Sequence, residues 1–378
     1  MAAAGPSGAA TRQLFLAATG QNRGKTTTSL GLFAAFRARG LETAFMKPVG
    51  QRWITLDGEP ADEDAALMRG VFNLTDPVNL LSPVQIPRGF TRSVINGEVV
   101  EDLGARILVA QQRLAVGRDL LLLEGTGHAG VGAVIGLSNA DVAFLLGAPA
   151  VIVSEGGIGR PIDEIVLNAA LFAARGVEVA GAIVNKVNLD TQPELPRLLE
   201  RGLARHGIPL LGVLPYREIL SNPTLAIIED GLQGETLWPG RDMDAIIGRV
   251  SVAAMQAEHV LARIGESALV VVPGDREDVI EALASLWLDG RDHPNRPLGF
   301  VLSGGYRPSV RVSELLRRAN IFAVLMEGDT YSVASQVHDL LVKTHSEDTR
   351  KIDEIKSLVA KSLDIDRVLQ AARPLPVR

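Results

Sequence analysis

The sequence predicts an α/β protein in which a doubly wound parallel sheet is followed by a second, smaller α/β domain. Short apolar runs alternate with longer segments of helical period, which is typical of parallel strands joined by crossover helices. The 378 residues are 47% hydrophobic and 22% charged, which is enough apolar material for two cores. Because no uninterrupted apolar run approaches the roughly 18 residues of a membrane-spanning helix, we expect no contact with a membrane.

The first domain is predicted from apolar runs that are closed by glycine or polar residues. The six predicted strands cover residues 14–18, 43–47, 120–124, 150–154, 180–185 and 210–214. The amphipathic helices between them are predicted over 27–39, 105–116, 162–175 and 195–206. The connection from Arg52 to Asp102 is too long for an ordinary loop, so we expect it to carry a helix over 64–69 and to contribute to a site.

Beyond residue 216 the pattern predicts a linker, a second domain and a tail. Prolines and glycines interrupt 217–265, where we expect a linker that includes a helix over 250–264. Apolar runs then alternate with helical segments, with strands predicted over 269–272, 298–302 and 321–326, and helices over 277–287, 310–318 and 333–342. The predicted organisation is therefore a flexible tail (1–12), a first domain (13–216), the linker (217–265), a second domain (266–345) and a C-terminal helical tail (346–378), whose charged pattern favours a solvated packing helix over a coiled coil.

Charge and cysteine content exclude several classes of protein. Lys and Arg total 38 against 44 Asp and Glu, a net charge of −6, and no basic block is present, so we expect no nucleic-acid partner. The absence of cysteine excludes disulfides, thiolate metal sites and a cysteine nucleophile, and it is compatible with the reducing cytoplasm, where we expect the protein. The six histidines are scattered singly, so neither a zinc cluster nor a catalytic triad is expected.

A glycine-containing turn joins the first predicted strand to the first predicted helix. Gly24 allows backbone N–H groups to surround a phosphate, Lys25 can reach the β- and γ-phosphate oxygens, and the Thr26 hydroxyl can ligate Mg²⁺. The candidate nucleotide-binding residues in this turn are Gly20, Asn22, Arg23, Gly24, Lys25, Thr26 and Thr27. The first glycine stands one residue closer to the second than in the usual phosphate-binding loop, and the alternative is an ordinary turn with an exposed lysine.

Charged residues close two further predicted strands. Glu124 follows an apolar run and precedes a Gly-Thr-Gly turn, so it can hold Mg²⁺ at the carboxyl edge of the sheet or cap the next turn. Lys47 ends the second strand, where it can neutralise a γ-phosphate or a substrate carboxylate, or remain a solvated surface lysine. Both are candidate functional residues because the carboxyl ends of parallel strands meet at one edge.

Three weaker signals have structural alternatives. Asp64 stands with Asp62 and Glu63 at a predicted helix start, where acids are favoured by the helix dipole. Asn185 ends a strand, so its amide can read a nucleotide base or satisfy a turn. In the second domain, the strand-end turns 273–278 and 303–306 can bind an anion or simply connect elements.

Taken together, the motifs of the first domain resemble dethiobiotin synthetase and its relatives. The matching segments are Gly24-Lys25-Thr26, Met46-Lys47-Pro48-Val49, Glu63-Asp64-Ala65, Leu123-Glu124-Gly125-Thr126-Gly127 and Val184-Asn185-Lys186-Val187. The resemblance implies a P-loop NTPase domain that binds ATP and Mg²⁺, with Thr26, Asp64 and Glu124 around the metal and Lys25 and Lys47 as catalytic cations.

Nearly all of residues 12–370 also resemble the non-catalytic N-terminal region of long phosphate acetyltransferases, in which a DRTGG domain follows the P-loop domain. The matching segments are 18–20, 28–31, 273–278, 303–306 and 329–332. The chain stops where the acetyltransferase domain would begin, so we do not expect acetyl transfer. The short phosphate loop and Gln51, which stands where a small substrate-binding residue is usual, argue against diaminopelargonate carboxylation. Gly20 stands where ATPases that dimerise over ATP carry a second lysine, which disfavours that mechanism.

Two functions remain open at this stage. One is an enzyme that transfers a phosphoryl group from ATP to a small carboxylate or carbamate. The other is a nucleotide-sensing regulatory protein whose partner belongs to acyl-phosphate or acyl-CoA metabolism and which has no turnover of its own. A fold retained only for assembly is a third possibility, and the resemblance also implies a homo-oligomer.

Overall fold

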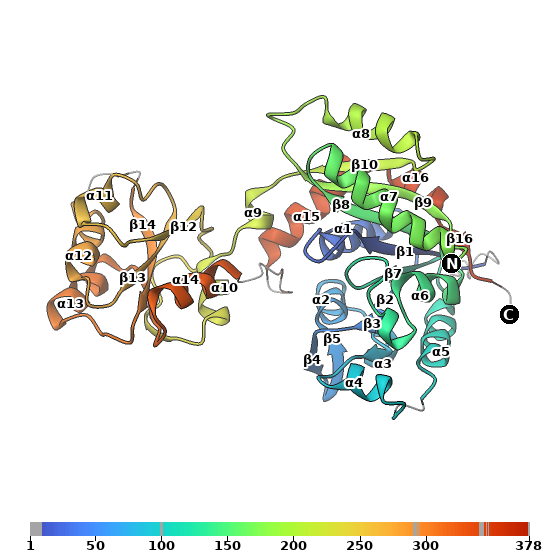
Figure 1. The fold of residues 1–378 in the computed structure, drawn as a ribbon, viewed down its shortest axis with the longest axis horizontal. Helices are drawn as coiled ribbons and strands as arrows, with labels where there is room; N and C mark the ends of the chain where they lie inside the picture. Colours follow the sequence, from blue (N-terminus) through green and yellow to red (C-terminus); the bar gives the residue numbers. More distant parts are fainter. Residues whose placement is uncertain are drawn as a thin grey trace, which may run out of the picture. The chain divides into compact units, whose positions relative to one another are not determined.

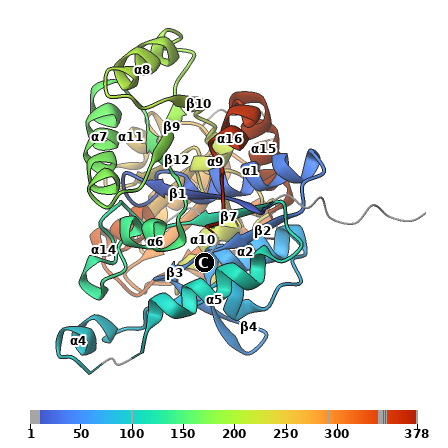
Figure 2. The same cartoon turned by 90° about the vertical axis from the view of Figure 1, so that its right-hand side faces the viewer.

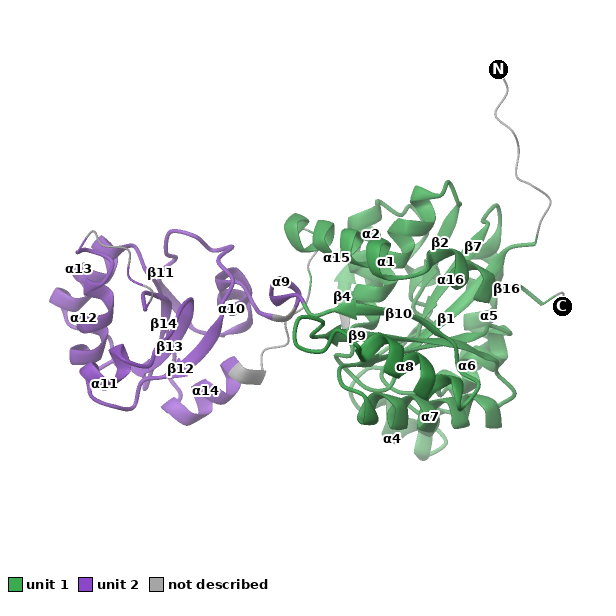
Figure 3. Ribbon diagram, turned by 90° about the horizontal axis from the view of Figure 1, so that it is seen from above, with its two compact units in different colours: residues 1–216, 344–378 green, residues 217–343 purple. Residues whose placement is uncertain are grey.

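The computed structural model describes residues 10–98, 101–289, 293, 295–339, 344, 346 and 348–376. The chain divides into two compact units, one formed by residues 1–216 and 344–378 and the other by residues 217–343 (Figure 3). The second unit is therefore an insertion between two segments of the first. Residues 217–265, which we expected as a linker, belong to the second unit, and residues 346–378, which we expected as a tail, belong to the first.

The first unit is built on a parallel sheet in which the strand that leads into the phosphate loop is central (Figure 1). The strands lie in the order β10 (Leu210–Pro215), β9 (Val179–Val187), β8 (Ala150–Glu155), β1 (Arg12–Ala18), β7 (Leu120–Glu124) and β2 (Thr43–Met46). A short strand, β16 (Arg373–Pro374), pairs antiparallel with the start of β1. The strands are buried on both faces, as expected for a parallel sheet covered by helices.

Helices cover both faces of this sheet. Helix α1 (Lys25–Ala38) packs against α15 (Thr349–Ser362) and α16 (Ile365–Ala371), so a segment from the end of the chain lies beside the first helix (Figure 2). The helices that connect the other strands are α5 (Leu103–Ala115), α6 (Asn139–Leu146), α7 (Gly159–Ala174) and α8 (Leu195–Ala204), with the 3₁₀ turn η1 (Ala133–Ile135) before α6. The predicted doubly wound α/β class is confirmed.

The long connection after β2 carries small elements of its own. They are β3 (Val49–Gly50), β4 (Trp53–Leu56), β5 (Glu59–Asp62), α2 (Glu63–Phe72), α3 (Val78–Leu81), β6 (Val84–Gln85) and α4 (Phe90–Ile95). The expected short helix at 64–69 is therefore part of a longer helix, α2. Asp62 caps its N-terminus by accepting a hydrogen bond from the Asp64 N–H at 3.0 Å.

The second unit is a smaller α/β fold with a five-stranded sheet. The strands lie in the order β11 (Glu235–Trp238), β15 (Phe322–Leu325), β14 (Pro297–Ser303), β13 (Ala268–Pro273) and β12 (Arg249–Val252), with β11 alone antiparallel. Its helices are α9 (Glu218–Ser221), α10 (Leu225–Gly231), α11 (Ala257–Leu261), α12 (Glu277–Ser285), α13 (Val310–Ala319) and α14 (Thr330–Asp339). Alternate residues of β13 enter two apolar cores: Val270 packs with α11–α13, and Leu269 packs with α10 and α14.

Three local expectations differ from the structure. The continuous helix expected over 250–264 is wrong, because residues 249–252 form β12 beside β13 and only Ala257–Leu261 is helical. The alternating Val250-Ser251-Val252 favours a strand once a neighbouring edge is available. The expected tail over 1–12 overlaps β1, which begins at Arg12, whereas residues 1–9 lie outside the described residues. The charged segment after 348, expected as one packing helix, forms two helices, α15 and α16, and each buries its apolar face.

Within the described residues, no helix combines the length and the apolar character needed to cross a membrane.

Candidate functional site

The turn between β1 and α1 exposes an uncapped helix N-terminus. Helix α1 begins at Lys25, and no side chain caps its first N–H groups, nor does its first turn contain an acid. Such an N-terminus has free N–H donors and the positive end of the helix dipole, which together favour an anion. Gly24 has φ +90°, and a Cβ atom there would lie 1.9 Å from Asn185 Nδ2. Only glycine therefore fits at this position of the turn.

Side chains from α1, β2, α2 and β7 meet beside this turn. Lys47 Nζ lies 2.6 Å from Asp64 Oδ2 and 3.0 Å from Glu124 Oε1. The Thr26 hydroxyl lies 3.0 Å from Asp64 Oδ1 and 3.1 Å from Glu124 Oε1. Because β7 lies between β1 and β2, its terminal Glu124 is placed between the phosphate loop and Lys47. We call Thr26, Lys47, Asp64 and Glu124 the carboxylate cluster.

Burial makes this cluster electrostatically unusual. The Lys47 side chain is 3% exposed and that of Glu124 is fully buried. Burial alone would lower the Lys47 pKa, but the charges of Asp64 and Glu124 outweigh it and raise that pKa above its ordinary value. Burial raises the pKa of Glu124 despite Lys47. Burial also opposes ionisation of Asp64, yet its ion pair with Lys47 holds the Asp64 pKa below its usual value.

Two neighbouring groups complete the local charge distribution. Lys25 is 8% exposed, and its Nζ lies 3.4 Å from the Gly127 carbonyl oxygen. Burial and the charge of Lys47 lower the pKa of Lys25 to about 8. Asp62 is buried at the start of α2, and burial raises its pKa to about 6. The sequence indicated Asp62 only as a helix cap, because its burial follows from the packing of the long connection after β2.

The phosphate loop is also fixed by an ion-pair network that the sequence did not indicate. Arg23 pairs with Glu155 at the end of β8, and its second terminal nitrogen lies 3.5 Å from Glu164 Oε1 on α7. Lys186 Nζ lies 3.0 Å from the Asn22 carbonyl oxygen and 3.1 Å from Glu155 Oε2. Glu155 ends a strand just as Glu124 does, and that shared position was the available signal.

Asn185 is committed to the phosphate loop by both ends of its amide. Its Nδ2 donates to the Arg23 carbonyl at 3.2 Å, and its Oδ1 accepts from the Lys186 N–H at 2.8 Å.

The other predicted loop residues lie in the turn itself or at the start of α1. Gly20 lies against the Arg23 side chain, and Asn22 has φ +58°. Thr27 lies half-buried in the first turn of α1.

The turns at the carboxyl edge of the second sheet use their own backbone donors. Gly304 N–H donates to the Gly328 carbonyl at 2.8 Å, and Gly305 N–H donates to the Met326 carbonyl at 2.9 Å. At the start of α14, Asp329 Oδ1 accepts from the N–H groups of Tyr331 and Ser332. These contacts favour the connecting role of the turns over anion binding.

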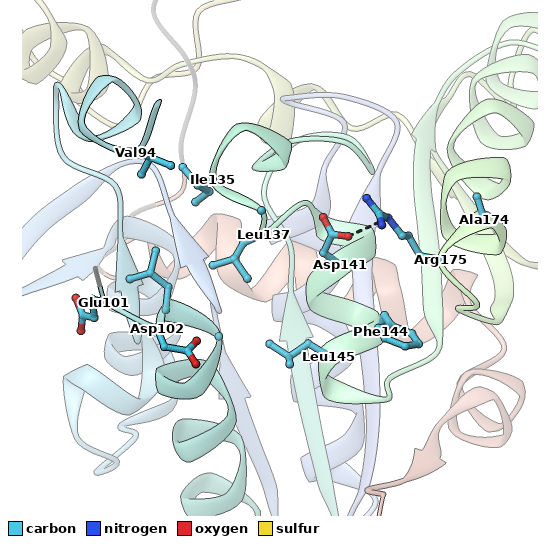
Figure 4. A pocket seen from close by; sticks show the side chains of 13 residues that line it. Val94, Glu101, Asp102, Ile135, Leu137, Asp141, Phe144, Leu145, Ala174 and Arg175 are labelled. Atoms are coloured by element: carbon cyan, nitrogen blue, oxygen red, sulfur yellow. Dashed lines mark ion pairs between the residues drawn. The ribbon is translucent and has the colours of Figure 1, made fainter. Parts of the chain in front are cut away.

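A separate cleft lies on the first unit and contains none of the predicted site residues. It has a volume of about 630 Å³ and is lined by residues from the start of α5, η1, α6 and the end of α7. Asp141 on α6 pairs there with Arg175 at 2.9 Å (Figure 4). Apolar Leu137 and Phe144 line it together with the acids Glu101 and Asp102.

The donor set of the carboxylate cluster fits Mg²⁺ bound together with phosphates. Glu124 Oε2 is buried and has no hydrogen-bond partner in the described structure, which leaves one oxygen free for a cation. Hydroxyl and carboxylate oxygens are the ligands that Mg²⁺ prefers, usually one or two carboxylates completed by phosphate oxygens and water. Among the residues that the structure describes, no group of three or more His, Asp or Glu side chains could hold a metal ion by itself.

Comparisons with known proteins agree with this two-unit architecture. The family model described as "AAA domain" matches residues 12–224, and the one described as "DRTGG domain" matches residues 228–340. A phosphate acetyltransferase of Pseudomonas putida is 26% identical over 93% of this chain and 50% of its own length. That of Deinococcus radiodurans is 28% identical over 93% of this chain and 50% of its own length. The chain thus spans about half the length of the curated relatives it matches.

Among solved structures, the CBS and DRTGG domains of the regulatory region of Clostridium perfringens pyrophosphatase, complexed with the activator diadenosine tetraphosphate, are 20% identical. The match covers 47% of this chain and 86% of that one, with a TM-score of 0.27. The resemblance to a dethiobiotin-synthetase-like P-loop domain with a DRTGG domain, as in phosphate acetyltransferases, is confirmed by the two family models and the curated relatives.

Proposed function

We propose that the first unit binds ATP with Mg²⁺ at the carboxyl edge of the main sheet, because this chain belongs to the AAA-domain family, whose model matches residues 12–224. The observation that carries the proposal is the convergence of the uncapped α1 N-terminus, Lys25 and the carboxylate cluster on one edge. Lys25 is buried beside free N–H donors, and its ammonium contacts a carbonyl oxygen rather than a carboxylate, so its charge is costly to maintain unless an anion uses it.

Each residue has a distinct part in this proposal. The backbone of Gly24 and the first turn of α1 bind phosphate oxygens, and Lys25 neutralises the β- and γ-phosphates. Thr26, Asp64 and Glu124 are the groups that would hold Mg²⁺, which would supply charge neutralisation at the phosphates. Arg23, Asn22 and Asn185 keep the loop in shape through the contacts described above.

As an enzyme, the protein would transfer the γ-phosphoryl group to a small carboxylate or carbamate. A carboxylate oxygen attacks the γ-phosphorus, the bond between that phosphorus and the β,γ-bridging oxygen breaks, and ADP leaves with the electron pair. Lys47 would then stabilise charge on the transferring group, because little else is required of the protein beyond positioning and neutralisation.

A second candidate function is supported by the curated relatives. They are phosphate acetyltransferases, and the chain spans only half of their length. The alternative that fits this relationship is a nucleotide-sensing protein that acts on a partner of acyl-phosphate or acyl-CoA metabolism. In such a protein the inserted second unit would transmit the nucleotide state without turnover.

Calorimetric titration with ATP, GTP and a non-hydrolysable ATP analogue, each with Mg²⁺, tests the binding proposal. We expect wild type to bind and Lys25→Ala to lose binding, whereas Lys356→Ala, a change at an exposed pair on α15, serves as the matched control. Absence of binding by wild type would overturn both candidate functions and leave a scaffold.

Phosphate release then distinguishes the two candidates. Turnover that is stimulated by carboxylic acids, or by amines with bicarbonate, supports the enzyme. Tight binding without stimulated turnover supports the sensor.

Two further proposals rest on the absence of cysteine, which is compatible with the reducing cytoplasm, and on the family resemblance, which implies a homo-oligomer. We place the protein in the cytoplasm and expect it to form a homo-oligomer. Fractionation of cells and light scattering of the purified protein test these two points separately.

A further inference from the structure

The ammonium group of Lys47 pairs with the same two carboxylates that a divalent cation would use. It contacts Asp64 Oδ2 at 2.6 Å and Glu124 Oε1 at 3.0 Å, and both carboxylates also lie within hydrogen-bonding distance of Thr26 Oγ1. Of the groups proposed to hold a metal, two are therefore already paired with a resident cation. Lys25, by contrast, is directed to the Gly127 carbonyl rather than to these carboxylates.

A resident ammonium and a metal ion exclude each other at this site. Like charges a few ångströms apart in a buried region repel strongly. Although Glu124 Oε2 has no partner, a divalent cation held by both Asp64 and Glu124 would lie within a few ångströms of the Lys47 ammonium. The backbone of Lys47 is held by a 2.7 Å hydrogen bond from its N–H to the Leu81 carbonyl. Exchange would therefore require movement of the flexible side chain alone.

We propose that the Lys47 ammonium and a divalent cation are alternative occupants of the Asp64–Glu124 pair, so that the nucleotide-free protein binds the free metal ion only weakly and binds it tightly only together with a nucleotide. The nucleotide makes the exchange favourable because its phosphates offer Lys47 a new anionic partner. This inference rests on the proposed function in taking Asp64 and Glu124 as the metal-holding carboxylates. It adds an order of binding that the resemblance does not contain.

Binding of Mn²⁺ alone, followed by electron paramagnetic resonance without nucleotide, tests this exchange directly. We expect Lys47→Met to bind Mn²⁺ about tenfold more tightly than wild type, because the competing charge is gone. Lys47→Arg keeps a cation and should bind as weakly as wild type. Lys356→Met removes a lysine that pairs with Asp353 on α15, away from the loop, and it should also bind as wild type does.

The site of the gained metal is checked by a second change. The double variant Lys47→Met with Glu124→Gln should lose the gain, because one of the two carboxylates is then neutral. Equal Mn²⁺ affinity in Lys47→Met and Lys356→Met, or a gain that survives Glu124→Gln, would overturn the proposal.

Lys47→Met leaves two carboxylates without their partner, so its folding needs a separate measurement. A melting temperature that millimolar Mn²⁺ restores towards the wild-type value would support the exchange.

If the variant remains unfolded with metal, acetic anhydride labelling of wild type followed by mass spectrometry decides instead. Lys47 should become at least about threefold more reactive when Mn²⁺ saturates the site, because exposure and proton loss govern amine reactivity. Unchanged reactivity would contradict the proposal.

These arms contain no nucleotide, so their result is independent of the ATP titration. A protein that fails to bind ATP but shows the Lys47-dependent metal gain would disprove the proposed function and retain the exchange. A protein that binds ATP but shows no gain in Mn²⁺ affinity in Lys47→Met would retain the proposed function and disprove the exchange.

Discussion

Gly24 lies directly against the side-chain amide of Asn185. Any Cβ atom at position 24 would approach Asn185 Nδ2 to 1.9 Å, and that same nitrogen donates to the Arg23 carbonyl at 3.2 Å. The strand end that carries Asn185 therefore determines the shape of the phosphate loop.

Replacement of Gly24 by alanine should weaken nucleotide binding by about tenfold or more, because either the loop or Asn185 must move and φ is +90°. Calorimetric titration with Mg²⁺·ATP measures the loss. Gly40→Ala is the matched control, since Gly40 also has positive φ but nothing lies within 4 Å of its added Cβ. Equal affinity in both variants would show that the contact with Asn185 does not shape the site.

Replacement of Gly31 by alanine should destabilise the first unit, because the added Cβ would lie 2.3 Å from Val359 Cγ2, where α1 meets α15. We expect a loss of about 1–3 kcal/mol in unfolding free energy, measured by urea denaturation. Adding Val359→Ala should recover part of the loss. Gly159→Ala, at the start of α7 with open space around it, should be close to neutral. A neutral Gly31→Ala would mean that α15 does not pack closely on α1 in solution.

Affinity for ATP should fall as the pH rises through about 8, because burial and the charge of Lys47 lower the pKa of Lys25 to about 8 and binding requires its charged form. Below that pH the Lys25 amine is already charged in the free protein, so the affinity for ATP is at its highest. Above it, binding must take up a proton, which calorimetry in buffers of different ionisation enthalpy detects. Lys25→Arg stays charged and should show a flat profile over the same range. A flat profile for wild type would contradict the lowered pKa.

The same pKa difference affects stability with the opposite sign. An unfolded lysine titrates near its ordinary value of 10.5, so between about pH 8 and that value the unfolded chain binds more protons. The contribution of Lys25 to the unfolding free energy therefore becomes more favourable as the pH rises through this window.

Replacement of Lys351 by methionine should stabilise the first unit. Lys351 is 4% exposed, its Nζ has no hydrogen-bond partner in the described structure, and burial lowers its pKa. Removing a buried cation without a partner should raise the unfolding free energy by about 1 kcal/mol. Lys361→Met, on an exposed position of the same helix, should leave stability within about 0.5 kcal/mol. A loss of stability in Lys351→Met would show that the ammonium has a favourable partner in solution.

Most of the first unit could be predicted because its elements are encoded locally. The apolar run that became β7 has its predicted bounds, and β1 and β8 differ from theirs by only two residues and one residue at one end. The prediction for 250–264 failed because Val250 and Val252 are compatible with either a helix or a strand until β13 supplies an edge to pair with. Likewise, nothing in the charged pattern after 348 indicates that α15 packs on α1.

The candidate site divides in the same way. The glycine turn, Lys25 and the strand-end residues Lys47 and Glu124 were recognisable by type and position, since parallel strands bring their carboxyl ends to one edge. Asp64 looked like a helix cap, and only the structure places it 2.6 Å from Lys47. The ion pairs of Arg23 with Glu155 and Glu164 were also not predictable, because they join segments more than 130 residues apart.

The sequence by itself determined the alternation of strands and helices, the phosphate-binding turn and the acidic and basic residue types that close the strands. These properties depend on periodicity, glycine conformation and charge within a few consecutive residues. Only the tertiary structure decided which charges are paired, that Lys47 occupies the oxygens of Asp64 and Glu124, and that the last helices complete the first unit. Those outcomes depend on strand order and on burial, and both arise from contacts between residues that are far apart in the chain.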